Sequence, residues 1–363
     1  MVTIRNIAQE AGYSASTVSR VLSGHRDVSD EARLRIQQVV DRHQYVLNRN
    51  AQNLKLHHSR TLVAVIKGRS NLLFQGILEV VQSRATAAGY AAVVEYIDED
   101  ANEVERAAIV ARQIRPAGFI FLGGHEDSFR AGYSQINVPA VLVTDGAVDL
   151  HLPALSSICT DDASGARRAI DYLIDLGHRV IGVVGGNPAV SFTSRQRLIG
   201  VDQAIHEAGL VFDRATQYVA GRYSLAEGQR GARELMTSRP DITAIFAMGD
   251  IQAIGVMRGL ADLRLAVPGD VSVVGFDGLE LSQYVVPRLV TVRQLYDRLA
   301  NGAVDLLLRQ VTEGAEATHV VIPFELAEGE SVRRLESQPG PRQRRVANAT
   351  LSADGCGRGG EVR

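Results

Sequence analysis

A run of hydroxyl side chains with one arginine, near the amino terminus, has the chemistry of a nucleic-acid reader. Ser16, Ser19, Arg20 and Ser23 recur at about one helical turn, so a helix would carry them on a single face. Short hydroxyl groups let a helix approach a groove closely and bind phosphate, and arginine can bind a guanine edge through two hydrogen bonds. The spacing alone also fits a solvated polar face on a small helical bundle.

Three short helices are predicted to position this face. Apolar residues recur at helical spacing behind Thr3, a capping residue, and Gly12 ends the first pattern. Ser14 can cap a second helix and Ser29 a third. The inner positions of these two helices are Val18, Val21 and Leu22, followed by Ala32, Ile36, Val39, Val40 and His43. Two short helices joined by a tight turn and buttressed by a longer third form a helix-turn-helix unit.

Residues 3–14 and 17–22 form two long and specific motifs, TIRNIAQEAGYS and TVSRVL. They closely resemble the DNA-binding head of the lactose/galactose repressor family of bacterial transcriptional regulators, although Tyr13 stands where valine is usual. The resemblance implies a set of DNA-binding residues in the head. Bases would be contacted by Ala15, Ser16 and Arg20, phosphate by Ser14, Thr17 and Ser19, and further positions on the DNA by Thr3 and Ser23.

Residues 45–55 resemble the hinge helix of the same family. An isolated helix below ~12 residues is marginal in water, so we expect this segment to fold when two copies meet in the minor groove of DNA. Leu54 has the position of a leucine that wedges between the central base pairs, and Asn48 and Ala51 complete the expected hinge contacts. Leu47 replaces the usual proline. A plain linker with Leu54 on its surface is the alternative interpretation.

The formal net charge of −2 conceals strongly segregated charge. Residues 1–60 carry nine basic and five acidic side chains, residues 333–363 carry seven and three, and the stretch between them has a net charge of −10. We therefore expect a DNA-binding head at 1–46, a hinge and linker at 47–60, a two-lobed effector-binding and dimerisation core at 61–332, and a disordered basic tail at 333–363.

The central stretch alternates short β-branched runs with helical patterns, which is typical of parallel sheets covered by helices. Two sets of strands are expected, one at 62–66, 91–95, 118–122 and 140–143, the other at 180–184, 216–219, 244–247 and 271–275. Strands 118–122 and 244–247 are alike, which indicates two similar halves. Ligands bind between such halves, at the carboxyl ends of the strands.

The predicted fold is therefore a small all-α helix-turn-helix head plus an α/β core of two Rossmann-like subdomains. The family resemblance extends over residues 2–331, including the junction at 175–182 and the strand at 267–277. It implies the two-lobed fold that also serves periplasmic sugar-binding proteins. The expected mechanism is closure of the two lobes on a ligand.

Nothing in the motifs favours catalysis. The chain has no G-x-G-x-x-G, P-loop, G-x-S-x-G or H-E-x-x-H pattern, and its nine histidines lack metal-ligand spacing. Two cysteines cannot build a disulfide framework or a multi-cysteine zinc site. No apolar run approaches the ~20 residues of a membrane helix. We expect a soluble, cytoplasmic, nucleoid-associated protein that is not an enzyme and has no cofactor, metal or membrane partner.

The family's effector positions can be transferred residue by residue. Arg197 matches an arginine that grips effector oxygens, and its planar fork of donors suits vicinal hydroxyls or a carboxylate. Asp277 matches an acid that accepts effector hydroxyl or amine protons, and Tyr223 an aromatic that stacks on a sugar or purine. The other expected effector-binding residues are Phe74, Asp161, Thr193, Asp250 and Gln294. Capping, turn, surface and core-packing roles are the alternatives for these residues.

These observations predict a ligand-responsive transcriptional repressor that binds a pseudo-palindromic operator as a homodimer. A small molecule in the cleft would control DNA affinity by binding the two lobe arrangements unequally. A polar, moderately aromatic site favours a sugar. A nucleobase-corepressed regulator, or a solute-binding protein with no role on DNA, are the alternatives.

Overall fold

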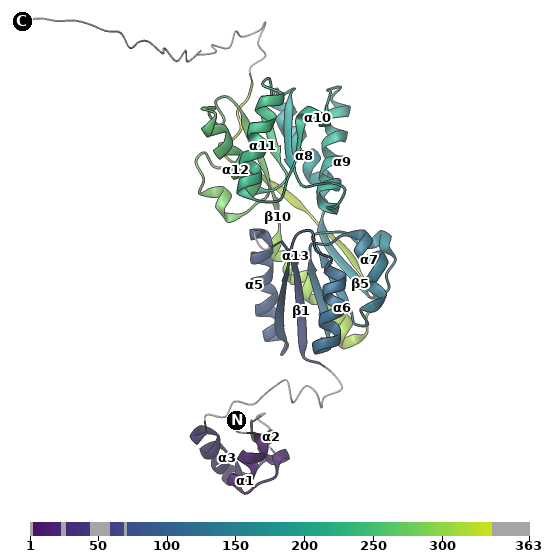
Figure 1. Cartoon of the computed structure of the whole chain (residues 1–363), viewed down its shortest axis with the longest axis vertical. Helices are drawn as coiled ribbons and strands as arrows, with labels where there is room; N and C mark the ends of the chain where they lie inside the picture. The colour runs from purple at the N-terminus through teal and green to yellow at the C-terminus, as the bar shows by residue number, and fades with distance from the viewer. Residues whose placement is uncertain (1–2, 23–26, 44–58, 69–70, 336–363) are drawn as a thin grey trace, which may run out of the picture.

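The computed structural model describes residues 3–22, 27–43, 59–68 and 71–335, which form a small helical head and two α/β lobes (Figure 1). The head consists of α1 (Ile4–Ala11), α2 (Ala15–Leu22) and α3 (Asp30–Arg42). The predicted combination of a helix-turn-helix head and a two-subdomain α/β core is confirmed.

Capping residues mark both ends of α1 and the start of α3. The Thr3 side chain accepts a hydrogen bond from the Asn6 amide, and Gly12 ends α1 with a φ of 77°, a left-handed conformation that favours glycine. Ser29 caps α3, as expected. The helices pack around buried Ile7, Val18, Ile36 and their neighbours, so the head has an apolar core of its own.

Each lobe is built on one six-stranded sheet within the described residues. The first sheet is entirely parallel, in the order β11-β5-β4-β3-β1-β2. Its strands are β1 (Thr61–Lys67), β2 (Ala91–Ile97), β3 (Gly118–Leu122), β4 (Ala140–Val143), β5 (Leu155–Thr160) and β11 (His319–Ile322). We call this half the first lobe.

The second lobe repeats the arrangement in the order β12-β10-β9-β8-β6-β7, with β12 antiparallel to β10. Its strands are β6 (Ile181–Gly185), β7 (Tyr218–Ala220), β8 (Ala244–Ala247), β9 (Ser272–Asp277), β10 (Val290–Gln294) and β12 (Phe324–Ala327). The equivalent strand orders confirm the prediction of two similar halves.

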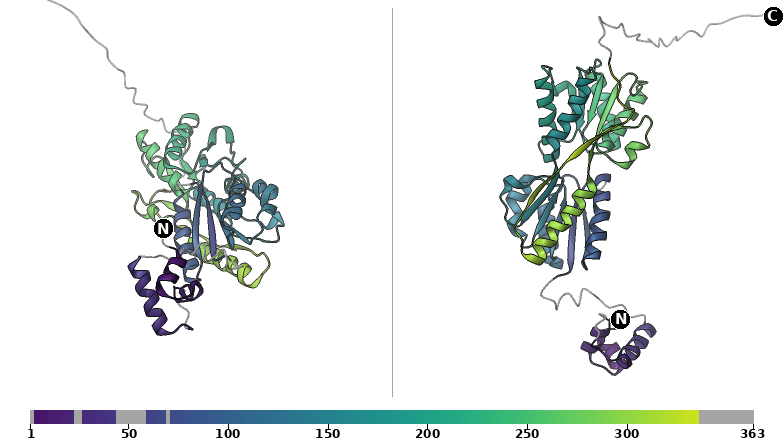
Figure 2. Two further views of the ribbon diagram at one scale, coloured as in Figure 1. Left: turned by 60° about the horizontal axis from the view of Figure 1, so that its bottom comes forward. Right: turned by 180° about the vertical axis from the view of Figure 1, so that it is seen from behind.

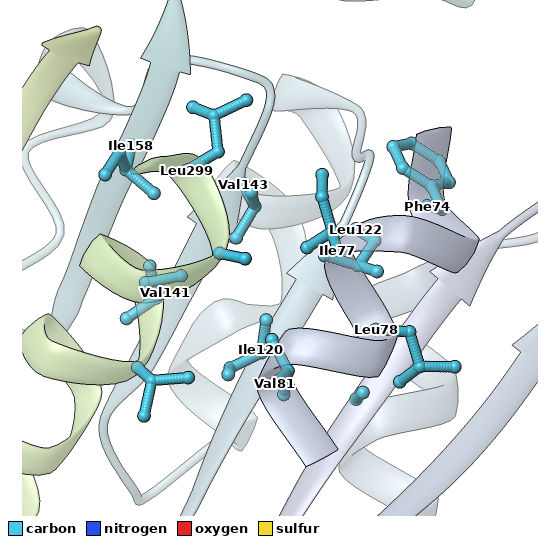
Figure 3. Close-up of a cluster of buried hydrophobic side chains, with 14 of the residues drawn as sticks. Phe74, Ile77, Leu78, Val81, Ile120, Leu122, Val141, Val143, Ile158 and Leu299 are labelled. Atoms are coloured by element: carbon cyan, nitrogen blue, oxygen red, sulfur yellow. The ribbon is translucent and has the colours of Figure 1, made fainter. Parts of the chain in front are cut away.

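Helices cover both faces of each sheet because strand side chains alternate between the faces. In the first lobe, α5 (Leu72–Ala87) and α13 (Tyr296–Glu313) pack on one face, and α6 (Glu103–Ile114) and α7 (Glu126–Gly132) on the other. Figure 3 shows the first of these cores, with Phe74 at its edge.

In the second lobe, α8 and α9 share one core, and α11 and α12 share the other. Their bounds are α8 (Asp162–Asp175), α9 (Phe192–Glu207), α11 (Leu225–Ser238) and α12 (Asp250–Asp262). The short elements are α10 (Arg214–Gln217), η1 (Tyr133–Gln135), η2 (Val148–Leu150) and η3 (Glu280–Gln283).

The chain passes between the lobes three times, after β5, after β10 and between β11 and β12 (Figure 2). Three parallel connections leave the lobes joined by a narrow bridge. Such a bridge suits a hinged closure because few backbone dihedrals have to change.

Most expected strands are found within a few residues of their predicted limits, but the one at 216–219 is only half right. Asp213 caps a short helix by accepting a hydrogen bond from the Ala215 amide, so α10 runs to Gln217 and β7 starts only at Tyr218. Strands β5, β10, β11 and β12 were not predicted. Two of them, β11 and β12, are short and only partly buried, so their apolar pattern is weak.

The core extends beyond its expected end at residue 332. The Leu335 amide donates a hydrogen bond to the Leu176 carbonyl, and the buried His178 ring contacts the Arg333 carbonyl through Nε2 at 3.1 Å. The Leu335 carbonyl would lie 2.8 Å from a Cβ at Gly177, so this segment needs a glycine beneath it. The predicted tail from 336 onward, and the hinge contacts of residues 44–58, lie outside the described residues.

Candidate functional site

A cavity of about 470 Å³ lies between the two lobes. Its walls come from the carboxyl ends of strands in both sheets, including Lys67 on β1, Thr144 after β4, Gly186 after β6 and Asp277 on β9. The size is typical of a small-molecule site. Five further expected effector residues line it, namely Phe74, Thr193, Arg197, Tyr223 and Gln294.

Arg197, on α9, is the buried cation of this cavity, with only 3% of its side chain exposed. Its Nε donates to Asp162 Oδ1 at 2.7 Å, and Nη1 donates to the Met248 carbonyl. Nη2 lies 3.7 Å from Asp277 Oδ1, and the guanidinium covers the Phe276 ring at 3.6 Å. The fork is therefore held rigidly and presents its Nη2 end to the cavity.

Asp277 and Gln294 form an acceptor pair next to this fork. Gln294 Nε2 donates to Asp277 Oδ1 at 2.9 Å, while Gln294 Oε1 is buried and has no hydrogen-bond partner. Asp277 has a φ of 119°, a strained conformation for a residue with a Cβ. Burial raises the pKa of Asp277 to about 6. A buried acceptor without a donor is costly, so this end of the cavity calls for a ligand that donates hydrogen bonds.

Two aromatic rings face the cavity from opposite lobes. Phe74 belongs to the first turn of α5, and Tyr223 lies between β7 and α11 with its hydroxyl 2.8 Å from Ser194 Oγ. A Cβ on Gly249 would lie 2.9 Å from the Tyr223 ring. Glycine at this position therefore leaves the room that the aromatic ring occupies.

Asp145, which follows β4, is a cavity residue that sequence reasoning missed. Its Oδ1 accepts a hydrogen bond from Thr193 Oγ1 at 2.6 Å, across the gap between the lobes, and its Oδ2 accepts from the Gly124 amide. Burial raises the pKa of Asp145 to about 7. A polar residue directly after a buried strand was the available signal, because such positions face the cleft in parallel sheets.

The predicted effector contact from Asp161 is not supported by its position. Asp161 is exposed and caps α8, accepting hydrogen bonds from the amide and hydroxyl of Ser164. Its neighbour Asp162 is the buried acid that pairs with Arg197. Neither acid lines the cavity, and Asp162 acts on the site only through its ion pair with Arg197.

The predicted role of Asp250 as a cleft-lining acid is wrong as well. Asp250 is fully buried, accepting a hydrogen bond from Thr291 Oγ1 at 2.5 Å and another from the Leu279 amide at 2.7 Å. Burial and the nearby charge of Asp277 raise its pKa well above the ordinary value. Asp250 supports the loop after Asp277 from behind and is absent from the cavity wall.

Two arginines of the second lobe form ion pairs with acids of the first lobe, outside the cavity floor. Arg222 in the second lobe contacts Asp98 at 3.2 Å and also Asp100, both of which follow β2 in the first lobe. Arg195 on α9 lies 3.5 Å from Glu126 on α7. These contacts, with the hydrogen bond from Thr193 to Asp145, hold the lobes together.

The residues expected to bind DNA that the structure describes lie on α2 or next to α1 and α2. Ser14, Ala15 and Ser16 are exposed at the start of α2 and Arg20 is exposed in its last turn, whereas Thr17 and Ser19 are half-buried. Thr3, the N-cap of α1, is exposed as well. Arg20 Nη1 lies 3.6 Å from Asp27, and both side chains are about 60% exposed. Ser23, Asn48, Ala51 and Leu54 lie outside the described residues.

Neither a membrane span nor a metal centre is found in the parts of the chain that the structure describes. No helix there is long and apolar enough to cross a bilayer. No three histidine, cysteine, aspartate or glutamate side chains in the same ranges are grouped in a way that could hold a metal ion.

Comparison with known proteins agrees with this organisation. Residues 3–48 match the family described as bacterial regulatory proteins, lacI family, and residues 170–332 match the periplasmic binding protein-like domain. The transcriptional regulator MalR of Clostridium butyricum is 32% identical over 339 residues, which cover 91% of this chain and 99% of that protein. The chain belongs to the lacI family of bacterial regulatory proteins.

Two solved structures share the fold over almost the whole chain. The lac repressor dimer bound to operator and an anti-inducer superposes with a TM-score of 0.77 at 26% identity, covering 92% of this chain and 99% of that one. The complex of the transcriptional regulator CelR with cellobiose gives 0.68 at 26% identity, with 91% and 100% covered. These relatives are transcriptional regulators, and none of the three is described as an enzyme.

Proposed function

We propose that this lacI-family protein is a repressor that binds a pseudo-palindromic operator as a homodimer and is controlled by a sugar in the interlobe cavity. The observation that carries the proposal is the combination, in one chain, of a lacI-family head with a polar, aromatic-walled cavity between two lobes. The head counts against a solute-binding protein with no role on DNA. The proposed site of action is the nucleoid.

The exposed start of α2 is proposed to read the operator. Ala15 and Ser16 stand at its first turn and Arg20 one turn further, so the three can face base edges together. The Ser14 hydroxyl lies 2.7 Å from Ser16 Oγ and 2.8 Å from Thr17 Oγ1. This group of hydroxyls at a helix N-terminus suits a phosphate of the DNA backbone.

Leu54 is proposed to wedge between base pairs in the minor groove. A wedge bends DNA and adds specific contact, whereas non-specific binding depends on phosphate charge. Leu54→Ala should therefore weaken binding to the operator much more than binding to unrelated DNA. Gel-shift titrations with both DNAs measure the two losses, and equal losses would remove Leu54 from the wedge position.

The loop from η3 to β10 is proposed as part of the dimer interface. Leu281, Tyr284 and Val286 are 41%, 73% and 92% exposed, which is unusual for three large apolar side chains within six residues. We propose that a second copy of the same chain covers these residues, because binding to two half-sites of an operator requires two heads. A two-fold axis would then place two heads on inverted half-sites.

A sugar is proposed as the effector because the cavity offers acceptors, one rigid guanidinium fork and two aromatic faces. Vicinal hydroxyls donate to carboxylates such as Asp277 and accept from Arg197, and the apolar faces of a sugar ring pack on Phe74 and Tyr223. The CelR complex, in a related structure, holds cellobiose. Ligand binding to one lobe arrangement shifts the population and moves the anchor of the hinge at Thr61.

Footprinting on the DNA upstream of the gene tests the proposal directly. We expect a protected, pseudo-symmetric site of two half-sites, whose protection weakens steeply between low and high salt because phosphate contacts release counterions. The same footprint with sugars and with purine bases tests the effector class. Absence of a symmetric site at any salt concentration would refute the DNA-binding function. If purine bases but no sugars changed the protection of the operator, the effector would be a nucleobase and not a sugar.

A further inference from the structure

The interlobe cavity continues past Arg222 of the second lobe. A smaller cavity of about 260 Å³ adjoins it, and both are lined by Lys67, Asn71, Glu99, Arg222 and Tyr223. We call the larger space the inner cavity and the smaller one the outer cavity. Because five residues form walls of both, the two spaces are neighbouring compartments of one elongated site.

We propose that these compartments together bind one uncharged disaccharide, with one ring in each, and reject phosphorylated and acidic sugars. This inference rests on the proposed function, since it specifies the sugar class of the same site. The size of the cavities supports a ligand of two rings. At about 30 Å³ per water, the inner cavity alone holds roughly 16 water molecules. A hexose has only about a dozen non-hydrogen atoms, so one ring in the inner cavity leaves room for a second ring that extends into the adjoining outer cavity.

The pairing of the wall's cations is the second argument. Lys67 Nζ lies 2.7 Å from Glu103 Oε2, and Glu103 is fully buried. Arg197 is paired with Asp162, and Arg222 with Asp98 and Asp100. Every cation lining either compartment therefore already has a carboxylate partner. An anionic ligand in the inner cavity, where Arg197 is only 3% exposed, would find no unpaired cation to neutralise it, which is unfavourable for a buried charge.

The acceptors of the wall are the third argument. Gln294 Oε1 is buried without a donor, and Asp277 and Asp145 are carboxylates that burial makes harder to ionise. In the junction between the compartments, burial raises the pKa of Glu99 as well, although Arg222 opposes the shift. Hydroxyl groups can donate to the Gln294 oxygen and to ionised carboxylates, and can accept from a protonated carboxyl. Phosphate or carboxylate oxygens cannot donate to the Gln294 oxygen and are repelled by every acid that stays ionised.

Isothermal titration of the full-length protein distinguishes these ligands. The panel is glucose, maltose, cellobiose, trehalose, glucose 6-phosphate, trehalose 6-phosphate and glucuronate. We expect at least one neutral disaccharide to bind about tenfold or more tightly than glucose, and the anionic sugars to bind at least tenfold more weakly than their neutral counterparts. Tighter binding of glucose or of a phosphorylated sugar would overturn the inference while leaving a sugar-controlled repressor in place.

Glu99→Trp tests the compartments separately, because a large ring at the junction obstructs the second sugar. The affinity for the disaccharide should fall about tenfold or more towards that of glucose. The control is Glu105→Trp, an equal change at an exposed position of α6 that does not line either cavity. Equal disaccharide affinities for the two variants would overturn the two-compartment assignment. If the wild-type protein gave no operator footprint, the proposed function itself would be refuted.

Discussion

At the residue scale, Arg20 is the side chain on which operator specificity is expected to depend. It is exposed at about 60%, it lies outside the apolar core of the head, and it forms an ion pair with Asp27 at 3.6 Å. An exposed pair of this kind contributes little to stability. The arginine is therefore available to exchange Asp27 for a base edge when DNA binds.

Arg20→Ala should weaken binding to the operator by ~1–3 kcal/mol, the value of one bidentate base contact, and should relax sequence preference at one position of each half-site. Fluorescence anisotropy with operator and single-base variants measures both effects. The control is Arg35→Ala, which removes the same charge at an exposed position of α3. Equal losses for the two variants would mean that Arg20 acts only through its charge.

Asp145 makes stability depend on pH in a defined direction. Because burial raises its pKa to about 7, the folded protein holds this proton at pH values where the unfolded chain has lost it. The free energy of unfolding therefore falls as pH rises from about 4 to about 7. Asp145→Asn should reduce this slope, by up to about 1.4 kcal/mol per pH unit. Urea unfolding of both proteins near pH 5 and pH 7 measures it, and identical slopes would contradict the assignment.

At the element scale, the loops after β2 and β7 are joined by ion pairs between the two lobes. Arg222 joins them by contacting Asp98 and Asp100, and all three side chains are more than half exposed. Exposed ion pairs contribute ~0–1 kcal/mol. That amount suffices to shift a balance between open and closed lobes several-fold.

Arg222→Gln should open the ligand-free protein and weaken effector binding by up to about fivefold, because a smaller fraction of molecules is closed. Small-angle scattering reports the opening and titration reports the affinity. Arg258→Gln is the matched control, since Arg258 pairs with Asp262 within a single helix. An unchanged radius of gyration in the Arg222 variant would show that this pair does not hold the lobes together.

At the scale of the whole molecule, the dimer is what converts one weak head into an operator reader. Two heads on one particle bind as a bivalent ligand, so loss of the dimer costs far more than one head's contacts. The exposed apolar residues between η3 and β10 are the proposed contact.

Tyr284→Glu should therefore raise the dissociation constant of the dimer about tenfold or more, by placing a charge in an apolar contact. Sedimentation velocity over a concentration series measures this, and operator affinity should fall with it. Val211→Glu provides the comparison, because Val211 is 80% exposed at a separate site. A dimer that survives the Tyr284 change would place the interface elsewhere.

The predictability of the fold differs among elements for physical reasons. The head helices and strands such as β3 and β4 were predicted closely, because capping and apolar runs act within a few neighbouring residues. β5 was missed since Ser156, Ser157 and Thr160 interrupt its apolar pattern, yet all three are buried. Ser156 contacts Gln310 on α13, and Ser157 contacts His319 on β11. Their burial depends on partners that are distant in sequence.

The sequence by itself determined the family, the helix-turn-helix head, the two-lobed core and the cavity residues Arg197, Tyr223 and Asp277. Long motifs and local periodicity carry that information. Only the tertiary structure decided which acids face the cavity. Asp145 faces the cavity, and Asp162 pairs with Arg197. Asp161 caps a helix instead, and Asp250 supports a loop. All four carboxylates follow or flank a strand, and the packing of the next element decides whether such a side chain meets a backbone amide or the ligand space.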